Sequence, residues 1–168
     1  MEDGRGTERS EEMRRPEREI KDRETITSIL AQSPVGRMAT INSKGFPVIK
    51  PVNFVYWNGK VYIHSSTKGE KVKDIHRGSP VCFELDQPVA YAPAHGPACM
   101  AGYYYRSVII KGKATLLKNS EKKLMSLQKL MEKYQPEGGY EPIADEILRK
   151  TAVIEISIQH LTGKERLG

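Results

Sequence analysis

Short runs of β-branched and aromatic residues, joined mostly by turn signals, constrain the fold of this chain more than any other feature of its sequence. The clearest turn is Asn58-Gly59, which separates two such runs and tolerates the positive φ angles of a tight hairpin. The run from Ala152 to Gln159 alternates apolar and polar residues with the period of a half-buried strand. Because helices do not alternate regularly with these runs, we predict a mainly β fold, a closed or nearly closed antiparallel barrel of six strands with flanking helices.

The predicted strands are Val35–Ile41, Phe46–Trp57, Lys60–His64, Val81–Leu85, Tyr103–Leu117 and Ala152–Gln159. Helical stretches are predicted after a cap at Asp22, after a capping box of Thr67 and Glu70, after a cap at Ser120, and near Ile143–Leu148. Pro47 and Pro51 complicate the second strand, because proline donates no ladder hydrogen bond. They indicate an edge, a bulge or backbone that faces a ligand.

The length of 168 residues fits one domain preceded by a tail. Residues 1–24 are mostly charged or polar, so we expect a flexible tail there and a folded domain over residues 25–168. No apolar run approaches the roughly 20 residues of a membrane helix, and the N-terminus lacks the apolar segment of a secretory signal. With only two cysteines, Cys82 and Cys99, and no disulfide framework, the expected location is the cytoplasm.

The net charge of +6 raises the question of a nucleic-acid partner. Lysine and arginine are interleaved with aspartate and glutamate along most of the chain, rather than gathered in one stretch. This pattern disfavours nucleic acid and agrees with affinity for a small anionic ligand.

The segment from His64 to Lys71, His-Ser-Ser-Thr-Lys-Gly-Glu-Lys, leads from a predicted strand into a predicted helix. Backbone N–H groups at a helix start, hydroxyl groups and lysine side chains together suit a phosphate. Taken alone, the segment favours the simpler interpretation, in which Ser66 and Thr67 cap a helix and both lysines are solvated. It has neither the spacing of a P-loop nor that of a dinucleotide-binding glycine motif.

Five segments in the same order resemble the FMN-binding split barrels related to pyridoxamine phosphate oxidase. They are Val35–Thr40, Gly45–Phe54, His64–Lys71, Tyr105–Ile109 and Leu161–Lys164. Among the branches of that family, the chain looks most like the one that includes the nitroimidazole-resistance reductases. The resemblance covers roughly residues 13–164.

The resemblance implies a six-stranded antiparallel split barrel that forms a homodimer with the flavin between the two subunits. It implies phosphate contacts from Lys50, Ser65 and Lys71, with Ser66 as a weaker candidate. Ring-edge contacts are implied for Val52 and Asn53. His64 and the pair Arg106-Ser107 match residues of the nitroimidazole-reductase branch near the cofactor.

His64 has two readings, because its ordinary pKa lies near neutrality. It is either a proton donor or substrate-anion ligand, or a histidine that orders the phosphate loop. His95 and Cys99 have no partners at the spacing of a zinc site, so no metal is predicted. Because Trp57 is the only tryptophan, the chain lacks the C-terminal Trp- and Arg-containing segment of pyridoxamine phosphate oxidases, and oxidation of that vitamin is not expected.

Two classes of function follow. The first is an FMN-dependent oxidoreductase that reduces a nitro compound, a quinone or a similar small acceptor, because the cofactor carries the redox chemistry. The proline-containing segment from Asp86 to Gly102 is then the loop expected to select the substrate. The second is a non-catalytic protein that stores or senses flavin or binds haem through His64 or His95.

Overall fold

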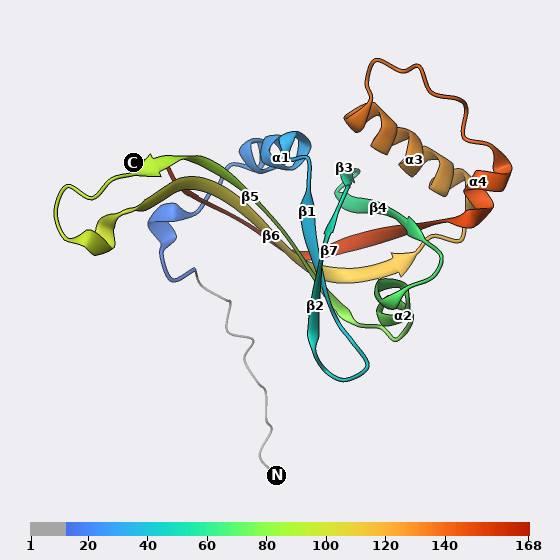
Figure 1. Ribbon diagram of the computed structural model, residues 1–168, viewed down its shortest axis with the longest axis horizontal. Helices are drawn as coiled ribbons and strands as arrows, with labels where there is room; N and C mark the ends of the chain where they lie inside the picture. The colour runs from blue at the N-terminus through green and yellow to red at the C-terminus, as the bar shows by residue number, and fades with distance from the viewer. Residues whose placement is uncertain (1–12) are drawn as a thin grey trace, which may run out of the picture.

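The computed structural model describes residues 13–168 (Figure 1). Its elements, in chain order, are η1 (Pro16–Arg18), α1 (Arg23–Gln32), β1 (Gly36–Ile41), β2 (Pro47–Val52), β3 (Val55–Trp57), β4 (Lys60–Ser66), α2 (Glu70–His76), β5 (Pro80–Ala92), η2 (Ala98–Met100), β6 (Gly102–Leu116), α3 (Ser120–Tyr134), α4 (Asp145–Lys150) and β7 (Thr151–Arg166). Within these residues, no helix is long and apolar enough to cross a membrane.

All strands belong to one antiparallel sheet of seven strands in the order β2-β1-β5-β6-β7-β4-β3. The prediction of a mainly β, antiparallel fold is therefore confirmed, but the strand number of six is wrong. The predicted strand Phe46–Trp57 is two strands that lie at opposite edges of the sheet. Val52 is the last residue that pairs with β1, and Val55 is the first that pairs with β4, so the chain changes partner at Asn53-Phe54.

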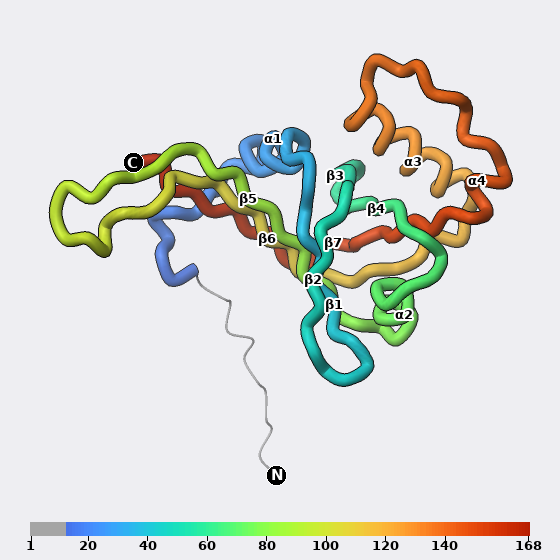
Figure 2. Tube along the Cα trace, in the orientation of Figure 1, coloured from blue at the N-terminus to red at the C-terminus, as the bar shows by residue number. Residues whose placement is uncertain are grey.

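Nearly half of the predicted loop Asp86–Gly102 is strand. β5 continues to Ala92, which pairs with Gly102 at the start of β6, and a register shift between Pro88 and Ala90 accommodates the proline within the ladder. Only residues 93–101 connect the two strands. Figure 2 shows this hairpin at one end of the molecule and helices α3 and α4 at the other.

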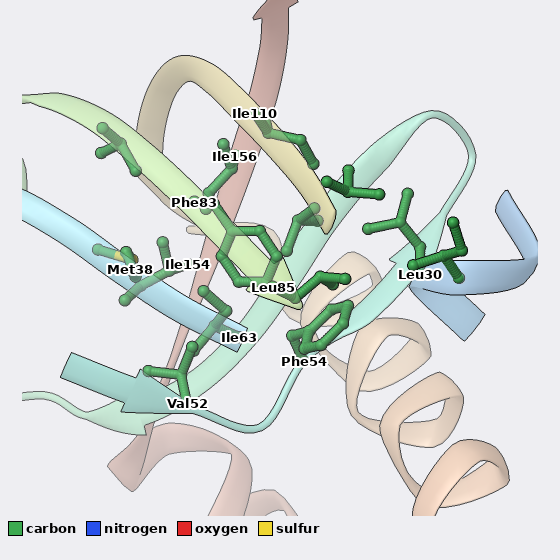
Figure 3. Close-up of a cluster of buried hydrophobic side chains, with 14 of the residues drawn as sticks. Leu30, Met38, Val52, Phe54, Ile63, Phe83, Leu85, Ile110, Ile154 and Ile156 are labelled. Carbon is green, nitrogen blue, oxygen red and sulfur yellow. The ribbon is translucent and has the colours of Figure 1, made fainter. Parts of the chain in front are cut away.

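The main core lies inside the curved sheet and contains residues from every strand except β3 (Figure 3). The Phe54 and Phe83 rings meet edge to face, with their centroids 4.9 Å apart. Phe83 also explains Gly36, because a Cβ at residue 36 would lie 2.1 Å from the Phe83 ring. Ile29 and Leu30 of α1 and Ile75 of α2 belong to the same core, so these two helices close the inner face of the sheet.

A second, smaller core lies between α3 and the other face of the sheet. Its members are Val55, Tyr62, Leu127, Leu130, Leu148 and Val153. Strand β4 separates the two cores: Val61 and Ile63 point into the main core, and Tyr62 points toward α3. This alternation is the expected period of a strand with both faces covered.

Two of the four predicted helix starts need correction. Asp22 caps α1 as predicted, since its carboxylate accepts hydrogen bonds from the amides of Glu24 and Thr25. The N-cap of α2, however, is Gly69, with a φ of 126° and no capping side chain, so Thr67 and Glu70 form no capping box. The cap of α3 is Asn119, one residue before the predicted Ser120.

Part of the segment predicted as a tail belongs to the folded body. Ile20 is buried in the main core, and its amide donates to the Gly163 carbonyl at 3.0 Å. Glu19 forms a bridge with Lys164 of β7. Residues 1–12 of the predicted tail lie outside the described residues.

Glu155 of β7 anchors the first turns of α3. Its carboxylate is 5% exposed and forms ion pairs with Lys60 of β4, at 2.6 Å, and with Lys122 of α3. Burial opposes ionisation of this carboxyl group, but hydrogen bonds from Lys122, Lys60 and Tyr62 outweigh burial and hold its pKa below the ordinary value. Glu155 lies on the face opposite the main core, as the alternation predicts, but α3 covers it.

Replacing Glu155 with glutamine should lower the free energy of unfolding by about 1–2 kcal/mol, because two lysines lose the charge that they share. Urea unfolding at pH 7 measures this loss. The matched control is Glu146→Gln, which breaks the exposed Lys150 pair and should cost less than about 0.5 kcal/mol. Equal effects of the two changes would contradict an anchoring role for Glu155.

Candidate functional site

Lys50 and Lys71 lie at the start of α2, and Ser65, near the end of β4, lies on the same side of the sheet as Lys50. Lys50 of β2 pairs in the ladder with the buried Met38, and Ser65 of β4 follows the buried Ile63 by two residues, so both lie on the inner side of the sheet. Lys71 is half-buried. Burial, and then the positive charge of Lys50, lower the pKa of Lys71, which places the two ammonium groups within electrostatic reach of each other.

Of these two lysines, Lys50 has a counter-charge. Lys50 Nζ lies 2.9 Å from Glu70 Oε2, and this ion pair lowers the pKa of Glu70. Among residues 13–168, no carboxylate forms an ion pair with Lys71. The cluster therefore carries net positive potential at a half-buried position, which suits an anion.

A buried carboxylate holds α2 in place. Asp74 is 1% exposed and accepts a hydrogen bond from Thr40 Oγ1 at 2.7 Å and another from Arg77 Nη2 at 2.9 Å. Val72 and Ile75, on the same helix, are also buried. Because α2 is fixed against β1 in this way, the position of Lys71 relative to β2 is fixed as well.

The loop before α2 is open. A Cβ at Gly69 would meet no atom within 4 Å, and the positive φ of Gly69 favours glycine there. Ser66 is exposed, and its hydroxyl oxygen accepts a hydrogen bond from the Lys68 amide at 3.2 Å. Ser66 thus lies beside the cluster with its hydroxyl group already used in the loop.

His64 and Asn53 meet on the opposite side of β4, in a pocket of about 420 Å³. The other lining residues are Leu127, Leu130, Met131, Tyr134, Ile143, Ile147 and Thr151. The walls are thus mainly apolar, and the few polar groups come from the sheet and from Tyr134. The helical period of α3 predicted an apolar face, but no local signal in the sequence showed that this face covers a pocket.

Two other predicted site residues, Val52 and Arg106, do not present their side chains to the pocket or to the lysine cluster. The Val52 side chain is buried in the main core, so only its backbone faces a ligand. Arg106 pairs with Glu165 of β7 in the ladder and through a 3.1 Å ion pair, whereas His64 pairs with Val153. Twelve positions of β7 separate these two points, roughly 40 Å along an extended strand.

Ser107 lies beside Arg106 and is equally remote from His64. A single chain therefore does not bring this pair to the rest of the site. The β5–β6 hairpin, expected to select substrate, is also at that far end, so the prediction is wrong for the chain's own pocket. In the described part of the chain, no three His, Cys, Asp or Glu side chains gather as metal ligands.

Residues 22–165 match the model of a protein family described as pyridoxamine 5'-phosphate oxidase. The chain belongs to this family. The resemblance seen in the sequence is thereby confirmed. No curated protein matches the chain.

Several solved structures share the fold of this chain. A candidate 5-nitroimidazole antibiotic resistance protein from Bacteroides thetaiotaomicron is 25% identical, with a TM-score of 0.77 over 88% of this chain and 86% of that one. The flavocytochrome Anf3 from Azotobacter vinelandii is 23% identical, with a TM-score of 0.84 over 96% and 75% of the two chains. An FAD and heme binding protein from Mycobacterium smegmatis is 19% identical, with a TM-score of 0.82 over 90% and 74%.

Lys133, next to the pocket residue Tyr134, is a partly buried cation that the sequence pattern does not indicate. Its Nζ atom lies 3.6 Å from the centre of the Phe54 ring and donates to the Leu30 carbonyl at 3.2 Å. Burial lowers the pKa of Lys133 to about 8. Between about pH 8 and 10.5 the unfolded chain thus binds a proton at this lysine that the folded chain has lost.

The contribution of Lys133 to stability should therefore increase as the pH rises through this window. We expect the free energy of unfolding of the wild type, minus that of Lys133→Met, to grow by on the order of 1–2 kcal/mol from pH 7.5 to pH 10. Urea unfolding of both proteins at several pH values measures the difference, and groups common to both cancel. A difference that is constant or falls with pH would contradict the burial of an ionisable amine here.

Proposed function

We propose that this protein is an FMN-dependent oxidoreductase that reduces a nitro compound, a quinone or a similar small acceptor. The observation that carries the proposal is the adjacency of two unlike sites across one strand. Ser65 lies on the side of the sheet that carries Lys50, and His64, its neighbour in β4, lines the apolar pocket. A ligand with an anionic end and a flat apolar end would use both.

The residues of the cluster fit a phosphate monoester. Within residues 13–168 no carboxylate pairs with Lys71, and a dianion would supply the counter-charge while favouring the charged form of the lysine. Lys50 would divide its hydrogen bonds between the phosphate and Glu70. Ser65 adds a hydroxyl donor. Three groups around one anion support FMN, whose phosphate is terminal.

The chain's own residues would bind and orient the reactants. A bound flavin supplies the electron transfer, which no side chain of the chain provides. The aliphatic walls of the pocket would exclude water from an acceptor, and Asn53 offers polar contacts at its edge. His64 lines the pocket, and its imidazole would hold or deliver the proton that accompanies reduction.

The similarity to the candidate 5-nitroimidazole resistance protein supports a nitro compound as acceptor. If the purified protein accepts electrons from NADH or NADPH and passes them to a nitro compound, it is an enzyme. Bound flavin without turnover would instead indicate storage. A cytoplasmic location stays a prediction.

Haem binding is the second candidate, because His64 stands at an apolar pocket and imidazole is a common axial ligand of haem. His95, the other histidine considered, lies in the exposed connection between β5 and β6 and lines no part of this pocket. A red protein with a strong absorption band near 400 nm that His64→Ala removes would favour haem.

We further propose a homodimer, since one chain leaves Arg106 and Ser107 far from His64. Exposed apolar side chains lie on the outer face of β2, β1 and β6, on either side of the Arg37–Glu84 ion pair of β1 and β5. Ile49 is 65% exposed, Ile41 37% and Ile109 39%, and all three point away from the main core. A two-fold axis at this surface would pair identical patches and let each subunit complete the other's site.

Replacing Lys71 with alanine should weaken FMN binding roughly 10- to 100-fold, the effect of losing one charge-assisted hydrogen bond. Riboflavin, which lacks the phosphate, should bind both proteins equally. Quenching of flavin fluorescence on the flavin-free protein measures both affinities. Lys73→Ala is the matched control, because Lys73 is exposed on the same helix.

Equal losses of FMN and riboflavin affinity in Lys71→Ala would contradict the phosphate role. A colourless protein that binds neither flavin at micromolar concentration would contradict the function itself. FAD binding stronger than FMN binding would keep the flavin but reject the monophosphate assignment.

Replacing Ile49 with glutamate should convert the dimer to a monomer, because it places a charge in the apolar surface at each of two symmetric positions. Sedimentation velocity measures the change from twice the 19.0 kDa chain mass to one chain mass. Met125→Glu is the control, since Met125 is an exposed apolar residue of α3. A monomeric wild type would rule out the dimer.

A further inference from the structure

The sheet has a break at Asn53-Phe54, and one side chain from α3 fills it. Neither residue pairs with a strand, because β2 ends at Val52 and β3 begins at Val55. Phe54 is fully buried, so its backbone N–H and C=O groups need partners away from water. Both lie within hydrogen-bond distance of the Tyr134 hydroxyl group.

The Tyr134 hydroxyl group uses its full hydrogen-bonding capacity. It accepts from the Phe54 amide at 2.9 Å. Its single proton has two acceptors, the Pro34 carbonyl at 2.8 Å and the Phe54 carbonyl at 3.1 Å. One oxygen atom thus joins the end of α3, the entry to β1 and the break between β2 and β3.

The surroundings of Phe54 leave the break little freedom. The Phe83 ring packs against one side of the Phe54 ring, and the Lys133 ammonium group lies over its face. With Phe54 fixed by its ring and by its backbone, the preceding residue, Asn53, is fixed as well. Asn53 itself is exposed and lines the pocket with His64 and Tyr134.

We propose that Tyr134 is a positioning residue that holds the Asn53 backbone in place for the edge of the flavin ring, an inference that rests on the proposed function. The Tyr134 hydroxyl group forms the hydrogen bonds with the Phe54 backbone that a neighbouring strand would otherwise form. The Asn53 peptide groups therefore remain unpaired by the sheet and available to a ligand. A planar ring with donors and acceptors along its edge would bind such a strand segment.

The test is Tyr134→Phe, which keeps the aromatic ring and removes only the hydroxyl group. Amide exchange at Phe54, followed by NMR in the wild-type and variant proteins, should accelerate at least tenfold, because the amide loses its acceptor. Affinity for FMN and for riboflavin should fall by the same factor, about tenfold, because the change acts at the ring and not at the phosphate. This pattern differs from that of Lys71→Ala, which affects FMN alone.

Two controls separate positioning from general loosening. Tyr140→Phe removes the hydroxyl group of another exposed tyrosine and should change neither measurement. Glu155→Gln loosens α3 at its other end and should lower stability without accelerating Phe54 exchange or weakening either flavin. A Glu155→Gln variant that weakens both flavins as Tyr134→Phe does would overturn the proposal.

Unchanged Phe54 exchange in Tyr134→Phe would also overturn it, whatever the flavin affinities are. If the wild type binds no flavin, the proposed function fails. The exchange measurement then still decides whether Tyr134 maintains the break, so the two failures are distinguishable.

Discussion

The two-residue period of β4 is the constraint on which the candidate site depends. Val61 and Ile63 are buried in the main core and Tyr62 in the core beneath α3, so consecutive side chains of this strand must enter different surroundings. His64 and Ser65 continue this alternation, so their side chains point to opposite faces of the sheet. Pairing of β4 with β7 over its whole length fixes the register, and a slip of one residue would exchange the two faces.

Elements of the fold that local chemistry decides could be predicted from the sequence. Asn58 and Gly59 have φ angles of 48° and 71°, as a two-residue hairpin turn requires, and Asp22 caps α1. The break at Asn53-Phe54 could not be predicted, because apolar alternation continues through it and only the choice of partner strand changes. The length of β5 was missed for a related reason: prolines indicate a loop, but a register shift within the ladder accommodates Pro88.

In the candidate site, too, local sequence patterns predict some residues, and long-range contacts place the others. Ser65 and Lys71 stand close in sequence, where a strand leads into a helix, so that local pattern identified them. Tyr134 reaches Phe54 across 80 residues, and the apolar face of its helix looks the same whether it covers a core or a pocket. Arg106 was placed by resemblance alone, and the register of β6 on β7 carries it away from the pocket of its own chain.

Lys50 and Lys71 are close to each other in the free protein, so their mutual repulsion is present before a ligand binds. Asp74, held by Thr40 and Arg77, fixes α2, and this keeps Lys71 half-buried near Lys50, without an ion pair to any carboxylate of residues 13–168. Burial and the neighbouring cation therefore disfavour the charged form of Lys71 in the free protein. An anion that binds there reverses the imbalance and favours proton uptake, so ligand binding and protonation of Lys71 are thermodynamically linked. A site arranged in advance spends less binding energy on reorganisation, and this favours a tightly held group.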